Sequence, residues 1–236
     1  MTQDTAANPH GESRVIDLSQ ILLALHEAPD SEETVQRVAE SSVSAVACDD
    51  AGVLLVHARN RVETAAATSQ PVARAHELQV ELDEGPCLDA LENPGVYSIT
   101  DTEADERWPR WSAEVTKLGY RSVLSVPLAT QARRFGSLNV YAARPDAFDD
   151  DDLAVTSILA RHASVSLASS RDVEGLRKAV DARKLIGMAM GLLMERYDVE
   201  PDPAFEVLRR YSQDHNIKLR DVARQIVEHR TLPGAS

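Results

Sequence analysis

The chain has 236 residues, of which 43% are hydrophobic and only 4% aromatic, so aliphatic side chains and alanine must fill its core. Its two cysteines, Cys48 and Cys87, are too few for a disulfide framework. The sequence contains neither a basic-then-apolar leader nor an apolar run of about 18 residues, the usual signals for secretion and membrane insertion. We therefore expect a cytoplasmic protein without a membrane partner.

The formal net charge of −13 is unevenly distributed. Residues 171–236 carry 12 basic and 11 acidic side chains, whereas residues 1–170 carry 13 basic and 27 acidic ones. An acidic segment repels a polyanion, although salt screens this repulsion beyond about 8–10 Å. If the protein binds a nucleic acid, the C-terminal part is therefore the place where we expect it.

The N-terminal third predicts two helices and a strand pair. Residues 1–13 are predicted to be a disordered tail. Apolar residues at helical spacing then predict two helices within residues 15–45, which Pro29-Asp30-Ser31 separates. Residues 51–57 form a short apolar run that suits a buried strand, and residues 62–68 are its predicted antiparallel neighbour.

The middle of the chain alternates between helices and strands. Pro86 follows the Glu84-Gly85 turn and is placed to begin a short helix. Residues 96–100, 122–128 and 136–142 are predicted strands, with a helix near residues 111–118 between the first two. Four aspartates at 149–152 then open a long helix, because acidic side chains are favoured at the positive end of the helix dipole.

This order of elements, together with three short strings, resembles a GAF domain. The strings are EGPCLDAL at 84–91, SVLSVPL at 122–128 and GSLNVYA at 136–142. The resemblance implies an α+β fold over residues 14–170, with a mainly antiparallel sheet, helices on its faces, and a sensor role. Cys87 and Leu88 are the candidates for the sensor pocket, since a thiol at a helix start has a lowered pKa. The alternative for Cys87 is a small buried packing residue. The sequence does not identify the ligand, which is a small molecule or a protein signal.

Residues 185–194, LIGMAMGLLM, are apolar on every side of a helix. Ten residues are too few to span a membrane, so other parts of the protein must cover this helix. Gly187 and Gly191 would allow a neighbouring helix to approach closely. Two further helices follow: one with Asp202 as its N-cap and Pro203 as its first residue, and one over residues 219–229 with a full apolar face.

These last three helices resemble an ANTAR domain, an RNA-binding module of bacterial transcription antiterminators, over residues 171–232. The positions that carry the resemblance are Leu176, Ala179, Val180, Arg183, Ile186, Ala189, Gly191, Leu192, Leu193, Met194, Ala204, Phe205, Leu208, Arg209, Leu219, Val222, Ala223 and Ile226. Met190 departs from the family pattern, which usually has a lysine at this position. The resemblance implies a structured RNA partner, a leader transcript with two paired hairpins.

The candidate RNA-binding residues are Arg183, Lys184, Ala189, Met190, Arg196, Lys218, Arg220 and Arg224. Arginine suits this role because its planar group pairs with phosphates and stacks on splayed bases. A solvated helical surface is the alternative for these cations. Two other functions stay open: a DNA-binding regulator that uses the last two helices as a helix-turn-helix, and a sensor with weakened RNA binding because of Met190.

The helix predicted from residue 149 to about residue 196 links the two modules. The heptad positions from 155 to 180 are apolar at both ends and polar in the middle: Val155, Leu159, His162, Ser166, Ser169, Val173, Leu176 and Val180. This pattern favours a homodimer through the linker, and Ser169-Ser170-Arg171-Asp172 is an alternative hinge. The seven histidines and two cysteines show no metal-ligand spacing, and the chain carries no catalytic motif, so we predict neither a metal site nor an enzyme. No cofactor is assigned.

Overall fold

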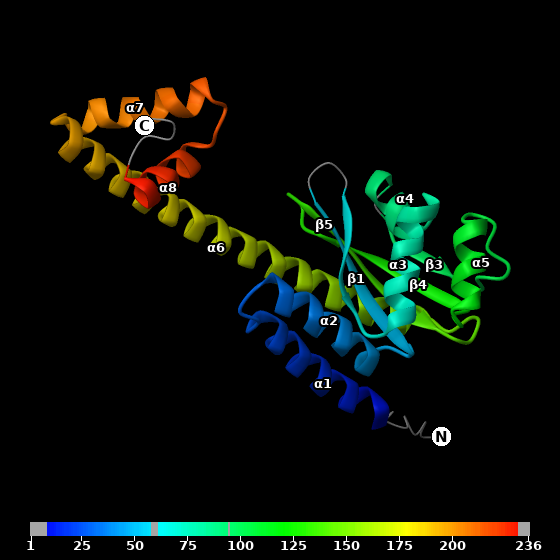
Figure 1. The fold of residues 1–236 in the computed structure, drawn as a ribbon. Coiled ribbons are helices and arrows are strands. Elements are labelled where there is room, and N and C mark those ends of the chain that lie inside the picture. The colour runs from blue at the N-terminus through cyan, green and yellow to red at the C-terminus, as the bar shows by residue number, and fades with distance from the viewer. Residues whose placement is uncertain (1–8, 58–60, 94, 231–236) are drawn as a thin grey trace, which may run out of the picture. The chain divides into compact units, whose positions relative to one another are not determined.

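The computed structural model describes residues 9–57, 61–93 and 95–230 and divides into two compact units, Met1–Arg171 and Asp172–Ser236 (Figure 1). Each unit is described here by itself. Residues 1–8 of the predicted tail and residues 231–232 of the predicted C-terminal domain lie outside the described residues. None of the helices in the described ranges is long and apolar enough to cross a membrane.

The first unit is built on one five-stranded antiparallel sheet. Its strands are β1 (Asp50–Val56), β2 (Val62–Ala67), β3 (Tyr97–Ile99), β4 (Ser122–Ala129) and β5 (Arg134–Ala142), in the order β2-β1-β5-β4-β3. Helices cover both faces of this sheet (Figure 1). The predicted α+β fold, with an antiparallel sheet and flanking helices, is confirmed.

Two hydrophobic cores lie on opposite faces of the sheet. On one face pack α1 (Pro9–His26), α2 (Ser31–Ala45) and the first turns of α6 (Asp150–Tyr197), with Leu25, Val38 and Leu159 fully buried. The other face carries α3 (Gln70–Leu82), α4 (Pro86–Glu92) and α5 (Pro109–Lys117), and Trp111 and Tyr141 are fully buried there. Because both faces of the sheet are covered, β1 is buried along nearly its whole length. Its sequence is accordingly an almost continuous run of apolar residues.

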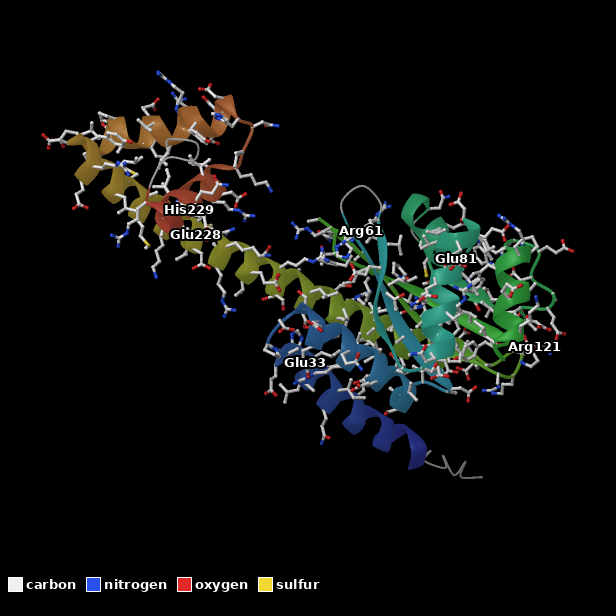
Figure 2. All side chains as sticks on the ribbon, in the orientation of Figure 1. Glu33, Arg61, Glu81, Arg121, Glu228 and His229 are labelled. Carbon is white, nitrogen blue, oxygen red and sulfur yellow. The ribbon has the colours of Figure 1, made fainter. Side chains whose placement is uncertain are left out.

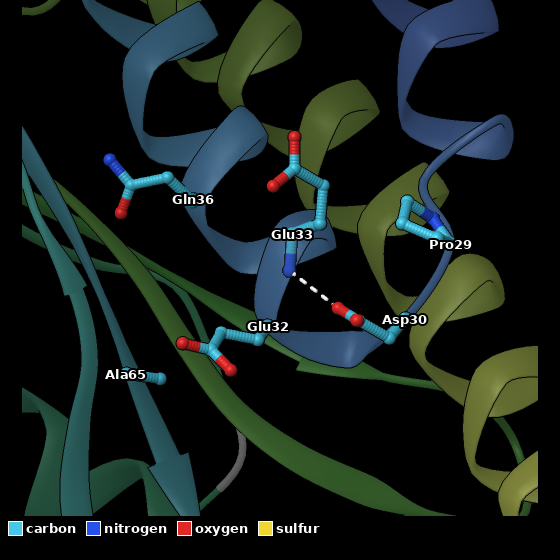
Figure 3. A pocket seen from close by; sticks show the side chains of 6 residues that line it. All are labelled: Pro29, Asp30, Glu32, Glu33, Gln36 and Ala65. Atoms are coloured by element: carbon cyan, nitrogen blue, oxygen red, sulfur yellow. Dashed lines mark hydrogen bonds between the residues drawn. The ribbon is translucent and has the colours of Figure 1, made fainter.

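Local signals in the sequence set where these helices begin. The Asp30 side chain accepts a hydrogen bond from the Glu33 backbone N–H at 2.9 Å and caps α2 (Figure 3). Ser69 caps α3 in the same way through the backbone N–H of Val72. Pro86 occupies the first turn of α4, as predicted from its fixed φ angle.

The second unit contains the C-terminal part of α6, α7 (Pro201–Asp214) and α8 (Leu219–His229). Ala189 and Leu193 of α6 pack with Ala204 and Leu208 of α7 and with Ile226 of α8. The predicted start of α7 is wrong, because Glu200 is its N-cap and Pro201 its first residue. The Ala204 backbone N–H donates to the Glu200 carbonyl at 3.1 Å, which closes the first turn before Pro203.

The apolar helix at 185–194 is covered on one side only. Ala189 and Leu193 are buried in the bundle, whereas Gly187, Met188 and Gly191 are exposed. A Cβ atom at Gly187 or Gly191 would meet no atom within 4 Å among the residues that the structure describes. Neither glycine therefore serves a close approach within this chain, because α7 and α8 pack on the opposite side of α6, and a close approach by a helix of a second copy stays a prediction.

We predict that Gly136→Ala disrupts the sheet and that Gly119→Ala does not. Both glycines have φ angles in the left-handed region, +153° and +100°, so alanine costs each about 1–2 kcal/mol in backbone strain. At Gly136 the new Cβ would also lie 1.8 Å from the Leu54 carbonyl oxygen, whereas it would meet nothing near Gly119. Urea unfolding of both variants tests this, and equal loss of stability would contradict it.

Candidate functional site

A row of polar side chains is buried between the sheet and the helices α3 and α4. In β5, Leu138 and Val140 enter the core beneath α1, α2 and α6, so the alternate residues Ser137 and Asn139 face the opposite side. Ser137 is 2% exposed and Asn139 fully buried. Polar groups at this depth need hydrogen-bond partners within the protein.

Cys87, on the first turn of α4, lies at the centre of this polar row. Its Sγ accepts hydrogen bonds from Ser137 Oγ at 3.0 Å and from Gln79 Nε2 at 3.3 Å. The thiol donates to Asn139 Oδ1 at 3.2 Å, and Ser125 Oγ lies 3.8 Å away. The buried cluster therefore joins α3, α4, β4 and β5 through one sulfur atom.

The structure explains the sequence EGPC at residues 84–87. Gln79 Oε1 accepts the backbone N–H of Cys87 at 2.9 Å and so satisfies a free donor at the start of α4. Gly85 precedes the helix with a φ of +142°, and a Cβ atom there would lie 2.4 Å from Gln79 Oε1. Glycine is thus required both for the backbone conformation and for the approach of Gln79.

Burial raises the pKa of the Cys87 thiol, and its four side-chain partners only partly offset this effect. Burial and the neighbouring Asp49 and Asp50 raise the pKa of Cys48 to about 12. Both thiols are therefore protonated at neutral pH, so the lowered pKa considered for Cys87 is absent. Cys87 is a buried hydrogen-bonded packing residue, while Leu88 beside it is half-buried.

His76 extends the polar cluster towards the edge of the sheet. Its Nε2 lies 3.2 Å from Asn139 Nδ2, and its ring is fully buried. Burial lowers the pKa of His76 to about 3, so the imidazole is neutral. Its Nδ1 is a buried polar atom without a hydrogen-bond partner among the described residues. In the sequence, His76 lies one turn before Gln79 and belongs to no motif, so its role is visible only in the structure.

In the second unit, three of the predicted RNA-binding cations are exposed and lie outside the ion pairs of the described residues. Arg183 and Lys184 are exposed on α6 and form no ion pair within the described part of the chain. Lys218 is exposed at the N-cap of α8 and is likewise outside the ion pairs of the described residues. These three side chains can reach an anionic ligand without first breaking a contact.

The other predicted cations already have partners. Arg196 Nη1 donates to the Arg230 carbonyl at 2.8 Å. Arg220 Nε and Arg224 Nη1 lie 3.3 Å and 3.6 Å from Asp221 Oδ1. Since all of these side chains are exposed, the pairs are weak and a phosphate can compete for them.

Ala189 and Met190 lie where side chains pack rather than where a ligand binds. Ala189 is fully buried, so it has no surface to offer RNA and is corrected to a core residue. Met190 is half-buried against the same core. A lysine at Met190 could extend its charged end past this core into solvent, which a methionine has no reason to do.

The linker helix α6 presents a stripe of uncovered apolar residues. Val173, Leu176 and Val180 are 43%, 68% and 64% exposed. Val155 and Leu159, earlier in the predicted heptad pattern, instead pack into the core of their own unit, with Leu159 fully buried. The pattern is therefore split, and only its C-terminal part is open to a partner.

Polar groups also lie close together at two other positions in the first unit, but neither group forms a complete metal or ligand site among the described residues. His26 Nε2 of α1 lies 3.2 Å from His162 Nδ1 of α6, and no group of three or more metal-ligating side chains occurs within the described ranges. A hollow of about 240 Å³ beside α2 is lined by Asp30, Glu32 and Glu33 (Figure 3). Of these, Asp30 caps the helix and Glu33 pairs with Arg37.

Comparisons with known families agree with this division. The model of the GAF domain matches residues 28–168, more than half of the chain, and the model of the ANTAR domain matches residues 174–227. The chain is a GAF domain followed by an ANTAR domain. Both domains are regulatory: GAF domains sense signals, and the ANTAR domain places the protein in a family of RNA-binding antitermination regulators. No curated protein matches the chain.

Solved structures share the fold of the GAF domain. The GAF domain of a phosphoenolpyruvate-protein phosphotransferase from Coxiella burnetii is 19% identical, with a TM-score of 0.56 over 70% of this chain and 98% of that one. The free methionine-R-sulfoxide reductase of Neisseria meningitidis is also 19% identical, with a TM-score of 0.54 over 73% of this chain and 98% of that one. At this identity the likeness shows the fold alone.

We predict that His76 makes the GAF domain less stable in acid. In the unfolded chain His76 has the ordinary histidine pKa of 6.5, whereas in the folded domain its pKa is about 3. Between these values the unfolded state holds more protons, so stability present above pH 6.5 is lost as pH falls, by up to about 1.4 kcal/mol per pH unit. Urea unfolding from pH 4 to 7 should show this slope reduced in His76→Gln. The exposed-residue variant His229→Gln should keep the wild-type slope, and equal slopes in all three proteins would contradict the prediction.

Proposed function

We propose that this protein is a signal-responsive regulator whose ANTAR domain binds structured RNA in nascent transcripts. Its action is transcription antitermination, in which the bound protein stabilises paired hairpins that compete with a terminator. The observation that carries this proposal is the joining of a GAF domain to an ANTAR domain whose α6 surface holds the free cations Arg183 and Lys184.

The charge distribution supports RNA as the ligand of the second unit. The ANTAR domain has about as many basic as acidic residues, while the preceding part is strongly acidic. Phosphate contacts by lysine and arginine supply most of the affinity for RNA, and arginine also stacks on unpaired bases. Arg183, Lys184 and Lys218 are the side chains available for these contacts, with Arg196, Arg220 and Arg224 able to join them.

Duplex DNA is a poorer ligand for the same unit. A helix-turn-helix would use α8 as the recognition helix. Both arginines of α8, Arg220 and Arg224, lie beside Asp221, and Glu228 follows on the same helix. Asp221 and Glu228 place two negative charges on the helix that would enter the major groove, so the DNA-binding alternative is disfavoured.

A second candidate is a sensor that has lost part of its RNA affinity. Met190 favours it, because this half-buried side chain stands where the family usually has a lysine. Under this candidate, Met190→Lys gains RNA affinity in a gel-shift titration. Under the leading proposal, the wild-type chain already binds with the other cations, and the variant gains little.

The GAF domain would supply the signal input. We propose that its sensor site lies around the half-buried Leu88 on α4, with the buried Cys87 beside it connecting α4 to the polar row of β5. A signal there reaches RNA binding only if it favours one of two states of the protein. A homodimer through α6 offers such a pair of states, because Val173, Leu176 and Val180 follow heptad spacing and a second copy would bury their exposed surfaces.

We predict that Arg183→Ala/Lys184→Ala weakens binding to a tandem two-hairpin RNA by about tenfold or more. Removing two phosphate contacts should also make the affinity less dependent on salt. Arg133→Ala/Arg134→Ala is the matched control. It removes two adjacent exposed cations from the GAF domain and therefore has the same net charge as the Arg183→Ala/Lys184→Ala variant. Gel-shift titrations at several salt concentrations, with single hairpins and duplex DNA as competitors, measure this.

Three experimental results would contradict the RNA proposal. Binding of the tandem hairpins that does not depend on salt, or tighter binding to duplex DNA, would contradict it. An equal loss of affinity in both double variants would show that net charge, rather than the α6 surface, governs binding.

We predict that Leu176→Asp/Val180→Asp makes the protein monomeric and weakens binding to tandem hairpins more than to one hairpin. Two charges in an apolar seam oppose association, and a monomer loses the gain in effective concentration from a second RNA-binding unit. Val96→Asp is the control, because Val96 is 45% exposed and lies outside α6. Light scattering after size-exclusion chromatography gives the oligomeric state. A wild-type monomer at all concentrations would refute the dimer.

A further inference from the structure

The aromatic side chains differ in exposure between the two units. Every tryptophan, tyrosine and phenylalanine of the first unit is buried or half-buried. In the second unit, by contrast, Tyr197 is 48% exposed and Phe205 is 36% exposed. Tyr211 is half-buried, and its ring is stacked on His215 with 4.1 Å between the ring centroids. The ANTAR domain is therefore the part of the chain that presents aromatic rings to a ligand.

Tyr197 is the last residue of α6 and has the most exposed of these rings. It lies outside the hydrophobic core of the second unit, and its hydroxyl group forms no hydrogen bond with the residues that the structure describes. Its ring lies near one cation, since the guanidinium carbon of Arg196 is 5.9 Å from the ring centroid. Neither core packing nor hydrogen bonding within the described part of the domain therefore accounts for an aromatic ring at this position.

The end of α8 positions Arg196 beside this ring. Helix α8 ends at His229, which is labelled in Figure 2, and the carbonyl of the next residue, Arg230, accepts a hydrogen bond from Arg196 Nη1 at 2.8 Å. Arg196 and Tyr197 therefore place a guanidinium group and an aromatic ring next to each other on the surface of the domain. Aromatic rings and guanidinium planes are the groups on which proteins stack unpaired RNA bases.

Tyr197 also lies on the same face of α6 as Arg183 and Met190. These three residues are seven positions apart, which is close to two full turns of a helix. Arg183 and Tyr197 are thus separated by about 21 Å along the helix axis, a length that roughly six stacked nucleotides cover. A single exposed aromatic residue is common on protein surfaces, but this one is aligned with an exposed arginine that can hold a phosphate of the same RNA.

We propose that Tyr197 is a stacking platform for an unpaired base of an RNA hairpin loop, while Arg183 and Lys184 hold phosphates of the same hairpin. The inference rests on the proposed RNA binding and names the side chain that recognises the loop. In a duplex the faces of the bases are covered by their neighbours, whereas a base in a loop can be splayed out and stacked on a protein ring. Tyr197 thus makes the domain prefer a hairpin loop to a continuous duplex.

Two substitutions of Tyr197 in the full-length protein test this role. Tyr197→Leu keeps an apolar side chain but removes the ring, and we expect it to weaken binding to the tandem two-hairpin RNA by about tenfold. Tyr197→Phe keeps the ring and should bind like the wild type. Because neither substitution removes a phosphate contact, both variants should keep the wild-type salt dependence, unlike Arg183→Ala/Lys184→Ala. Val207→Ala is the control and should bind like the wild type, since Val207 is 40% exposed on α7 of the same unit. Circular dichroism checks that all variants are folded.

Photocrosslinking shows which part of the RNA meets the ring. 5-Iodouridine is placed at one position at a time in the loop or in the stem of a hairpin, and mass spectrometry locates the protein residue to which it is linked. We expect a cross-link to residue 197 from a loop position and none from the stem. The cross-link should persist in Tyr197→Phe and be lost in Tyr197→Leu.

These measurements separate the stacking role from RNA binding itself. Wild-type protein without salt-dependent binding of the tandem hairpins would contradict the proposed function and the inference that rests on it. If the wild type binds, four results would each overturn the stacking role alone: equal affinity of Tyr197→Leu and the wild type, a reduced salt dependence in Tyr197→Leu, an equal loss of affinity in Tyr197→Phe or Val207→Ala, and no cross-link to residue 197 from any loop position.

Discussion

The interior of the GAF domain depends on one constraint: both faces of its sheet are buried, yet β5 places polar residues on one of them. Ser137 and Asn139 cannot reach water, so every hydrogen bond must come from the protein. Cys87 meets this demand by accepting from two side chains and donating to a third. The requirement also explains why α4 begins where it does, because Gln79 must reach both the Cys87 thiol and its backbone N–H.

The same network ends at a place where it is incomplete. A buried polar network stabilises a domain when every member is satisfied and is costly when one is not. In this domain the member without a hydrogen-bond partner among the described residues is Nδ1 of the fully buried His76.

Helix α6 contributes to the cores of both units. Its first turns bury Leu159 and Leu167 beneath the sheet, and its last turns bury Ala189 and Leu193 against α7 and α8. Between these two segments, Val173, Leu176 and Val180 have no core to enter. A helix that enters a core at each end and carries an exposed apolar stripe between them is suited to pairing with a second copy, which is the state that the proposed regulation requires.

The positions of many helices and strands in this protein can be predicted from its sequence. Apolar spacing, the Asp30 cap and Pro86 located the helices, and alternation within 136–142 located a strand with one polar face. The helices of the second unit could be predicted because apolar periodicity is a local property, and the residues at positions 176–226 carried the resemblance to an ANTAR domain. Only the tertiary structure decided which face of each helix is covered. It placed Ala189 in a core, left Gly187 and Gly191 open, and divided one heptad pattern between a core and a free surface. It also joined His76, Cys87 and Asn139, because hydrogen bonds between residues up to 63 positions apart depend on how strands and helices pack, which local spacing does not encode.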